Sequence, residues 1–283
     1  MAEQTTGLER VLTFGRLERL YSLHHKARSH LIPVSVIITT YNEAQNLERC
    51  LNALKDFDDV LVVDSNSTDE TVSIATRYGV RVQNFTWNGA YPKKRQWCLD
   101  NIETKYDYIF FVDGDEEITP DLVQEIKLLD FTAAGYFVKG QYIWRGCSLR
   151  HGLKNNKLAL FDKNKIEFPV VNDLDIEGMG EIEGHYQPIF KNFRCTGALN
   201  SQSDRIDQLQ SPLLHFAYED GKSWQKRHER YAYWEAQMIK RHAYPKDPKP
   251  WRERLKYLFR KFPCRGLIAF GHCYILNLGF LDG

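Results

Sequence analysis

The chain of 283 residues is long enough for one large domain with appendages and can bury a sizeable core. Its six cysteines form no C-x-x-C pair and no cluster with His, which argues against a structural zinc site and against a dense disulfide framework. The net charge of +1 conceals an asymmetry, because residues 222–265 carry 14 Lys or Arg and 4 Asp or Glu. We therefore expect a folded, acidic body with reduced and mostly buried cysteines, followed by a basic C-terminal region.

The start of the chain contains charged residues and no apolar core of a secretory signal. The chain also has no run of about 20 apolar residues, the length that crosses a bilayer. We expect a cytoplasmic protein that is peripheral on the cytosolic face of the membrane. Residues 7–28 are predicted to form a helix within an N-terminal extension, residues 1–32, which docks on the body or on a membrane.

Strand and helix patterns alternate from residue 34 to residue 128, which predicts an α/β domain with a mostly parallel central sheet flanked by helices. The expected strands are the β-branched or aromatic runs 34–40, 60–63, 80–82 and 108–112. The expected helices begin near residue 44, after residue 67, at Tyr91 and at Thr119-Pro120, and the third of them ends at Ile102. Ser67 and Glu70 form a capping-box pattern that predicts a helix with Val72 and Ala75 facing inward. Thr119 is the expected N-cap of the last helix.

Acidic residues follow the buried strand 108–112 immediately. Asp113 and Asp115 are separated by Gly114, which permits a tight turn, so both carboxylates can converge on one Mg²⁺ or Mn²⁺ ion. Since the carboxyl ends of parallel strands form the ligand edge of an open α/β sheet, the sequence predicts a metal site there. Taken alone, the same three residues are more typical of an acidic turn, and it is their surroundings that favour the metal site.

The alternation stops after residue 130. Residues 134–144 and 158–161 are predicted to be strands, residues 167–185 an acidic loop, and residues 223–241 and 251–262 basic helices. The second of these helices interleaves Trp251, Leu255 and Leu258 with Arg and Lys, which is typical of a surface that binds anionic lipid. A protein partner is the second interpretation, and we expect no nucleic-acid binding because no known nucleic-acid module accompanies the charge.

The order of motifs resembles the family 2 glycosyltransferases of the GT-A fold. A strand leads into T-T-Y-N-E at residues 39–43, a second ends in V-V-D-S-N-S-T-D-E at residues 62–70, and a third ends in F-V-D-G-D-E at residues 111–116. The resemblance covers residues 33–128, and weaker matches, E-G-H at 183–185 and G-F-L-D-G at the end, resemble the lipopolysaccharide-core β-glucosyltransferase branch.

The resemblance implies roles for individual residues. Thr40, Tyr41 and Glu43 would line the nucleotide pocket, Asp64 would accept a hydrogen bond from the nucleobase, and Arg95 would lie near the diphosphate. Asp113 and Asp115 match the D-x-D metal motif, with Asp115 the more direct ligand. His215 would bind metal or diphosphate, or would be a structural histidine.

Such enzymes need a carboxylate that takes the proton of the acceptor hydroxyl. Glu183 is our first choice for this base and Glu181 the second, and Asp173 and Asp175 stay open. The related branch has a His followed by an acid in this region, whereas here Glu183 precedes His185.

These observations predict an inverting, metal-dependent glycosyltransferase with a nucleotide-sugar donor and a saccharide or lipid-linked acceptor, as in polysaccharide or lipopolysaccharide biosynthesis. Its GT-A catalytic domain would span residues 33–220, with the nucleotide-sugar half at 33–128 and the acceptor half at 129–220, followed by a helical, basic amphipathic region at 221–283. An inactive scaffold of the same fold is the alternative, and a sugar nucleotidyltransferase is a further one, although the glycine-rich nucleotide loop of such enzymes is absent.

Overall fold

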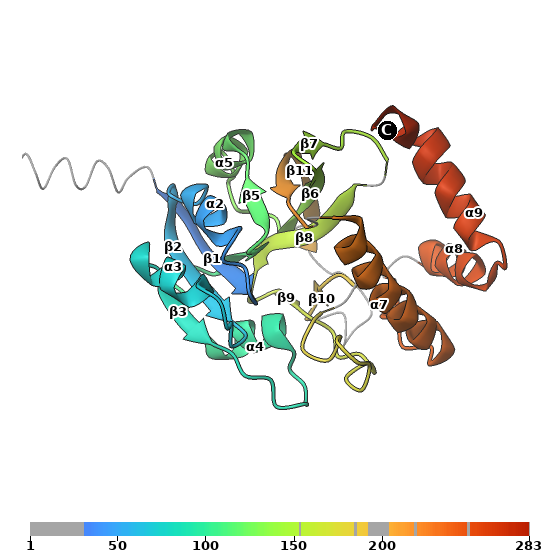
Figure 1. Ribbon diagram of the computed structural model, residues 1–283. Coiled ribbons are helices and arrows are strands. Elements are labelled where there is room, and N and C mark those ends of the chain that lie inside the picture. The colour runs from blue at the N-terminus through green and yellow to red at the C-terminus, as the bar shows by residue number, and fades with distance from the viewer. Residues whose placement is uncertain are drawn as a thin grey trace, which may run out of the picture.

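A curled, nine-stranded sheet forms the centre of the part of the chain that is described by this computed structural model, namely residues 31–152, 154–183, 186–191, 204–217, 220–247 and 250–282 (Figure 1). The strands follow one another in the sheet in the order β3 (Arg81–Asn84), β2 (Phe57–Asp64), β1 (Ile32–Thr40), β4 (Tyr108–Asp113), β8 (Asn155–Asp162), β6 (Gly135–Trp144), β11 (Ile206–His215) and β5 (Glu116–Ile118), with β7 (Cys147–Ser148) paired to β6. A separate two-stranded sheet joins β9 (Ile166–Glu167) to β10 (Ile189–Phe190).

The direction of the strands changes at β4. From β3 to β4 all neighbours are parallel, whereas β8 runs antiparallel to both β4 and β6, β11 is parallel to β6, and β5 is antiparallel to β11. The predicted α/β fold is confirmed, but the sheet is mixed beyond β4. A parallel pair needs a long crossover, usually a helix, and the residues described between β6 and β8 contain no such helix.

Helices cover both faces of the parallel half. One face packs against α2 (Leu47–Asn52), α3 (Thr71–Arg77) and α5 (Pro120–Lys127), and the other against α4 (Lys94–Asn101) and the chain around Phe168 and Phe190. The central strands are mostly apolar because side chains on both of their faces are buried, as Ile37, Val62 and Phe110 show. The core therefore fixes the strands, and polar residues occur where the strands end.

The predicted start of α5 is confirmed, whereas the predicted start of α3 is wrong. Thr119 caps α5, accepting a hydrogen bond from the backbone N–H of Leu122 at 3.2 Å. The capping box is wrong: α3 begins at Thr71 with no side-chain cap, because Ser67 donates its hydroxyl to Asp64. Val72 is exposed, because α3 turns Ile74 and Ala75 towards the sheet.

Two further differences concern α4 and the end of the sheet. α4 begins at Lys94 and not at Tyr91, since the chain is still extended at Lys93. No strand was predicted for β11 or β5, yet β11 lies inside the sheet between β6 and β5. β11 brings His215 to the edge at which β4 ends.

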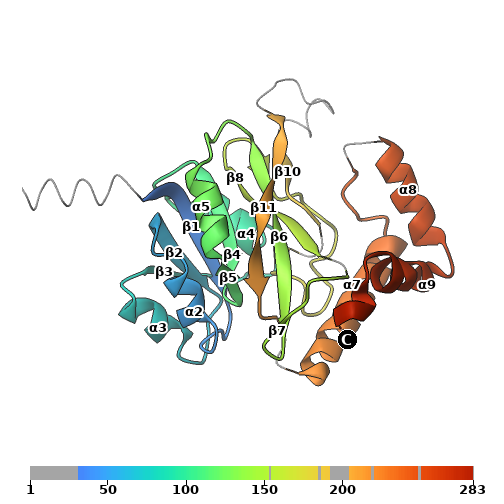
Figure 2. The same cartoon turned by 90° about the horizontal axis from the view of Figure 1, so that it is seen from above.

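The C-terminal region is helical, as predicted. α7 (Gly221–Lys240) is followed by α8 (Pro250–Lys261), α9 (Arg265–Phe270), the π-helical η2 (Gly271–Leu276) and the 3₁₀-helical η3 (Gly279–Asp282). In two views these helices lie at the end of the molecule opposite β3 (Figures 1 and 2). Within the described ranges, no helix combines the length and apolar character needed to cross a membrane.

The N-terminal helix and the burial of the cysteines were also predicted. The helix predicted at residues 7–28 lies outside the described residues. The cysteines are less buried than expected: of those in the described ranges, Cys50 and Cys98 are buried, whereas Cys147 and Cys264 are exposed.

Candidate functional site

The ends of β1, β2 and β4 bring most of the predicted site residues together. In the parallel registers Thr40 lies beside Asp64, and Thr39 lies beside Asp113. The hydroxyls of Thr39 and Thr40 each donate to the neighbouring carboxylate at 2.9 Å. The predicted site therefore occupies one continuous edge of the sheet.

Asp64 fastens the turn that follows β2. Its carboxylate is buried and accepts hydrogen bonds from the Thr40 hydroxyl, from the backbone N–H of Ser67 at 2.7 Å and from the Ser67 hydroxyl at 2.5 Å. An ionised carboxylate offers about four acceptor positions. Three of these acceptor positions are used by Thr40 and Ser67, so about one position is left for another hydrogen-bond donor.

Asp113 is surrounded by positive charge. Arg95 of α4 donates to its Oδ1 at 2.6 Å, and Nζ of Lys157 lies 3.4 Å from its Oδ2. Burial would raise the pKa of Asp113, but Arg95 and Lys157 outweigh it and hold the pKa well below its usual value. Burial also opposes the charge of Arg95, and Asp113 in turn raises the pKa of Arg95. The two groups are ionised together.

Lys157 and Glu116 are part of the same network and were not predicted. Nζ of Lys157, on β8, lies 2.5 Å from Oε2 of Glu116, whose carboxylate also accepts the backbone N–H of Asp113 at 3.0 Å. Burial works against the charge of Lys157, but Asp113 and then Glu116 raise its pKa. A lysine within a strand pattern gives no sign of its partners, because β8 meets β4 only through the antiparallel pairing that the sequence did not reveal.

Asp115 lies beside β11 and α7. Nε2 of His215 is 3.4 Å from its Oδ1, and Nη1 of Arg227 is 4.0 Å from its Oδ2. The His215 ring stacks on Tyr142 with ring centroids 5.0 Å apart, and its Nδ1 is buried without a hydrogen-bond partner among the described residues. Burial would lower the pKa of His215, but the Asp115 carboxylate outweighs it and raises that pKa.

Gly114 explains why the two aspartates can be so close to the end of β1. A Cβ atom at this position would lie 2.9 Å from Cγ of Glu43 and 3.1 Å from Cγ2 of Thr40. Glu43 is therefore packed directly against the turn, where burial and then the Asp115 charge raise its pKa to about 7. Tyr41, next to these residues, is 58% exposed.

Glu183 approaches the site from the acidic loop and caps α4. Its two carboxylate oxygens accept the backbone N–H groups of Arg95 and Gln96, both at 3.1 Å. These donors have no partner inside the helix, and a negative charge at a helix N-terminus is favourable. Burial raises the pKa of Glu183 although Arg95 and the two N–H groups oppose this. Glu181 contributes its backbone carbonyl, which accepts the N–H of Lys94 at 3.1 Å.

Asp173 and Asp175, the two acids of the loop that the sequence left open as the base, form ion pairs. Asp173 is buried, and its Oδ1 lies 2.8 Å from Nζ of the equally buried Lys93, while its Oδ2 accepts the indole N–H of Trp234 at 2.9 Å. Asp175 is exposed and forms two hydrogen bonds with Arg241 at 2.5 and 3.0 Å. These pairs attach the loop to the start of α4 and to α7. Of the four candidate acids, Glu183 is the one that bonds to Arg95, and Glu181 bonds to the neighbouring Lys94 through its backbone.

The donor groups at this edge fit a divalent cation at Asp115. Within the described ranges, no three His, Cys, Asp or Glu side chains are already grouped to hold an ion. Asp115 and His215 nevertheless offer a carboxylate oxygen and the ring nitrogen Nε2 side by side, 3.4 Å apart. Asp113 is engaged more closely, by Thr39, Arg95 and Lys157, than Asp115 is by His215 and Arg227.

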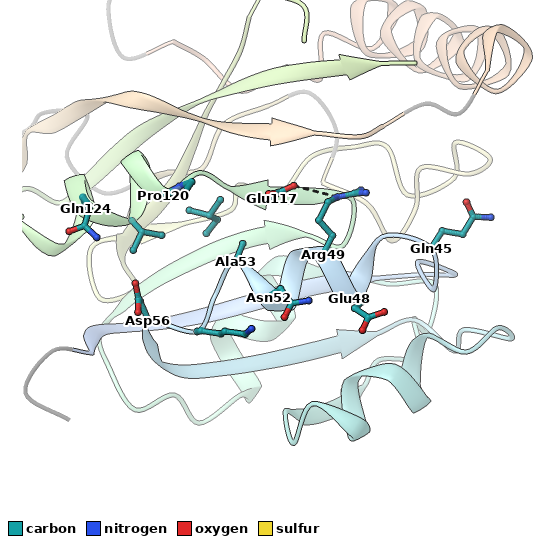
Figure 3. Close-up of a pocket in the computed structure, with 12 residues that line it drawn as sticks. Gln45, Glu48, Arg49, Asn52, Ala53, Asp56, Glu117, Pro120 and Gln124 are labelled. Atoms are coloured by element: carbon teal, nitrogen blue, oxygen red, sulfur yellow. Dashed lines mark ion pairs between the residues drawn. The ribbon is translucent and has the colours of Figure 1, made fainter. Parts of the chain in front are cut away.

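A groove of about 680 Å³ lies elsewhere, between α2, β5 and α5 (Figure 3). Figure 3 shows Arg49 and Glu117 facing each other across it, and their charged atoms are 3.6 Å apart. The groove is lined by none of the residues predicted for the donor site. We therefore assign the candidate site to the strand edge.

Two solved structures align with most of this chain. The crystal structure of S. aureus TarS 1–349 aligns over 84% of this chain and 74% of that one, with 19% identity and a TM-score of 0.47. The crystal structure of glucosyl-3-phosphoglycerate synthase from Mycobacterium tuberculosis, in complex with Mg²⁺ and uridine-diphosphate, aligns over 78% of this chain and 83% of that one. The identity is 19% and the TM-score is 0.44.

Sequence relatives match a shorter stretch. An uncharacterized glycosyltransferase of Rickettsia bellii is 39% identical over 97 residues, which are 34% of this chain and 32% of the relative. The chain thus matches about a third of the length of the curated relatives. The sequence model of glycosyl transferase family 2 matches residues 35–177, half of the chain. The protein belongs to glycosyl transferase family 2.

Proposed function

We propose that the protein is an inverting, metal-dependent glycosyltransferase that moves a sugar from a nucleotide-diphosphate-sugar donor to a saccharide or lipid-linked acceptor. The observation that carries this proposal is the mixture of charges at the strand edge. Two aspartates lie there within reach of three cationic side chains from α4, β8 and α7, namely Arg95, Lys157 and Arg227, and His215 of β11 lies beside Asp115. The catalytic domain would be residues 33–220, with the donor bound by residues 33–128 and the acceptor by residues 129–220.

The charges suit a nucleotide diphosphate as leaving group. As the bond to the sugar C1 breaks, negative charge builds up on the diphosphate. A divalent ion held by Asp115 and His215, with Asp113 nearby, would neutralise part of that charge. Arg95 and Arg227 add positive charge on both sides of this position, and the carboxylate of Asp113 keeps Arg95 oriented.

The nucleoside would bind along the end of β1. Thr40, Tyr41 and Glu43 would line its pocket, and the exposed ring of Tyr41 offers a surface for the base. Asp64 retains about one acceptor position, which would take an N–H of the base. A uracil-type base, which carries such an N–H, is therefore the first donor to test.

Glu183 is the base that we propose for the acceptor hydroxyl. Arg95 links it to the donor site, since the backbone N–H of Arg95 bonds to Glu183 while its guanidinium bonds to Asp113. Burial raises the pKa of Glu183, and a raised pKa makes a carboxylate a stronger base at neutral pH. Glu181 is the second candidate.

The substitution Glu183→Gln should lower the transfer rate by about 10²-fold or more, because the amide cannot take the proton. Donor binding should persist, since Gln still accepts one N–H bond at the start of α4 and none of the donor contacts changes. The rate is measured with donor and acceptor saturating, and Glu177→Gln, the same change at an exposed position of the same loop, is the control. Unchanged transfer by the Glu183 variant would assign the base to Glu181 or to another group.

The acceptor is proposed from the resemblance to the lipopolysaccharide-core branch and from the basic C-terminal helices. A saccharide carried on a lipid would place the enzyme at the cytosolic face of a membrane, as a peripheral protein. Growth of a cell-surface polysaccharide or lipopolysaccharide is the process that this acceptor class implies.

Binding of the donor can be tested directly by thermal unfolding with and without Mn²⁺. A nucleotide sugar at 100 times its dissociation constant stabilises the folded state by about 2.7 kcal/mol, so one nucleotide sugar should raise the melting temperature in the presence of Mn²⁺ and much less in the presence of a chelator. The corresponding nucleoside with Mn²⁺ is the control, because it lacks the diphosphate. An equal shift with the chelator would contradict metal dependence, and binding without any transfer would support the inactive scaffold.

A further inference from the structure

The C-terminal helices α8, α9, η2 and η3 contain no buried side chain, although residues 250–282 are all described. Large apolar side chains on them are strongly exposed, among them Trp251 at 62%, Leu258 at 63% and Leu276 at 75%. Residues 266–281 also contain no Asp, Glu, Lys or Arg. Large apolar side chains exposed on several successive helices mark an interaction site.

The helix α8 is turned so that its polar side faces the protein. Glu253 accepts the backbone N–H of Asp247 at 2.8 Å, and Lys256 donates to the Asp247 carboxylate, which is 4% exposed, at 2.6 Å. The guanidinium of Arg260 lies 3.9 Å from the centroid of the Tyr244 ring. These inward residues are three and four positions apart and so form one side of the helix.

The opposite side of α8 is apolar. Trp251, Leu255, Leu258 and Phe262 follow one another at intervals of four, three and four residues, and all are exposed. A helix that packs only against its own protein in water buries the apolar side and exposes the polar one. The orientation of α8 is the reverse, which requires an apolar environment outside the protein.

This C-terminal part is attached firmly to the body. Arg265 pairs with Glu235 of α7 at 3.0 Å, and the carboxylate of Asp282 lies 2.9 Å from Nδ1 of His151. The backbone N–H of Gly152 also donates to the carbonyl of Asn277 at 2.9 Å. The helices that carry the exposed apolar side chains are therefore joined to the body, and α8 and α9 lie at the end of the molecule opposite β3 (Figures 1 and 2).

We propose that residues 250–282 dock the protein on an anionic lipid bilayer, with the outward apolar side chains inserted below the headgroups. The exposed Arg254 and Lys261 flank the apolar side of α8, and anionic headgroups attract such residues. In a symmetric dimer through this face the same cations would oppose one another, which favours lipid as the occupant. The inference rests on the proposed function where it concerns the acceptor. The helix α7 contacts Asp115 through Arg227 and contacts the docking surface through Glu235, so it holds the donor site at a fixed position relative to the lipid.

Vesicle flotation of the full chain tests this surface. Wild-type protein should float with vesicles of phosphatidylglycerol and phosphatidylcholine, and should float less with phosphatidylcholine alone or at high salt. The double substitution Leu255→Gln and Leu258→Gln should weaken binding by about tenfold, because two large apolar side chains no longer insert. Leu128→Gln, which changes an apolar side chain that is 87% exposed on the body, should bind as wild type does.

Two outcomes would overturn the docking surface. One is equal binding by the double variant and the wild type. The other is sedimentation that shows a dimer in wild type and a monomer in the double variant without any vesicle binding, which would assign the face to a second copy of the chain. Thermal unfolding with a nucleotide sugar and Mn²⁺ separates this test from the proposed function: a retained shift with failed flotation overturns only the docking surface, whereas a missing shift in wild type counts against the donor site.

Discussion

Replacing Asp115 by Asn should reduce metal-dependent transfer by about 10³-fold or more. The amide keeps the shape of the carboxylate but removes the charge that would hold a divalent ion, and with it the neutralisation of the leaving diphosphate. The charge that faces His215 and Arg227 is lost as well. The measurements are the transfer rate across a Mn²⁺ titration and the Mn²⁺-dependent rise in melting temperature with the donor.

The control for this experiment is Asp207→Asn. Asp207 lies on β11, as His215 does, but towards the other end of the strand, where it is partly exposed and pairs with Arg205. The Asp207→Asn variant should retain both the transfer rate and the Mn²⁺-dependent rise in melting temperature. An Asp115 variant with the Mn²⁺ affinity of the wild type would contradict the assignment of Asp115 as a ligand, whatever its rate.

Replacing Lys93 by Met should destabilise the fold by about 3–5 kcal/mol, the cost of leaving one member of a buried ion pair without its partner. Asp173 would stay buried, and the carbonyls of Met179 and Ile182, which accept Lys93 at 3.0 and 2.8 Å, would lose their donor. Lys93 is also the N-cap position of α4. Activity should therefore fall together with stability. Urea titrations of the variant and the wild type measure the change in the free energy of unfolding.

Two further variants make this prediction specific. The double substitution Lys93→Met and Asp173→Asn should recover part of the lost stability, because the unpaired charge is removed. Arg241→Met breaks the exposed pair with Asp175 and should cost less than about 1 kcal/mol. A loss below about 1 kcal/mol for Lys93→Met would show that the buried pair does not hold the loop to α4.

The family and the fold class were predicted from the sequence and are confirmed by the match of residues 35–177 and by the α/β sheet with helices on both faces. The strands β1, β2 and β4 are buried on both faces, so their apolar runs stand out in the sequence, and each ends in a polar residue. The prediction that Thr40, Asp64 and Asp113 share one edge followed from this pattern. Their roles in binding and catalysis stay predictions.

The second half of the sheet was harder to predict. β6 and β8 were recognised, but β11 is interrupted by an irregularity between Gln208 and Pro212, which obscures the alternation of its side chains. Its place between β6 and β5 depends on pairing between residues about 70 to 100 positions apart. No local pattern in the sequence encodes such a pairing.

By itself, the sequence determined the parallel half of the sheet, the strand ends that carry the acids and the helical, basic C-terminal region, because each depends on a local pattern of apolar and polar residues. Only the tertiary structure decided that Lys157 neutralises Glu116 beside Asp113, that Glu183 caps α4 and that α8 turns its apolar side outward. Each of these depends on which distant segment lies next to a charged or apolar group. A charge far away in the sequence changes an ionisation or a helix end only when folding places it a few ångströms away and excludes water.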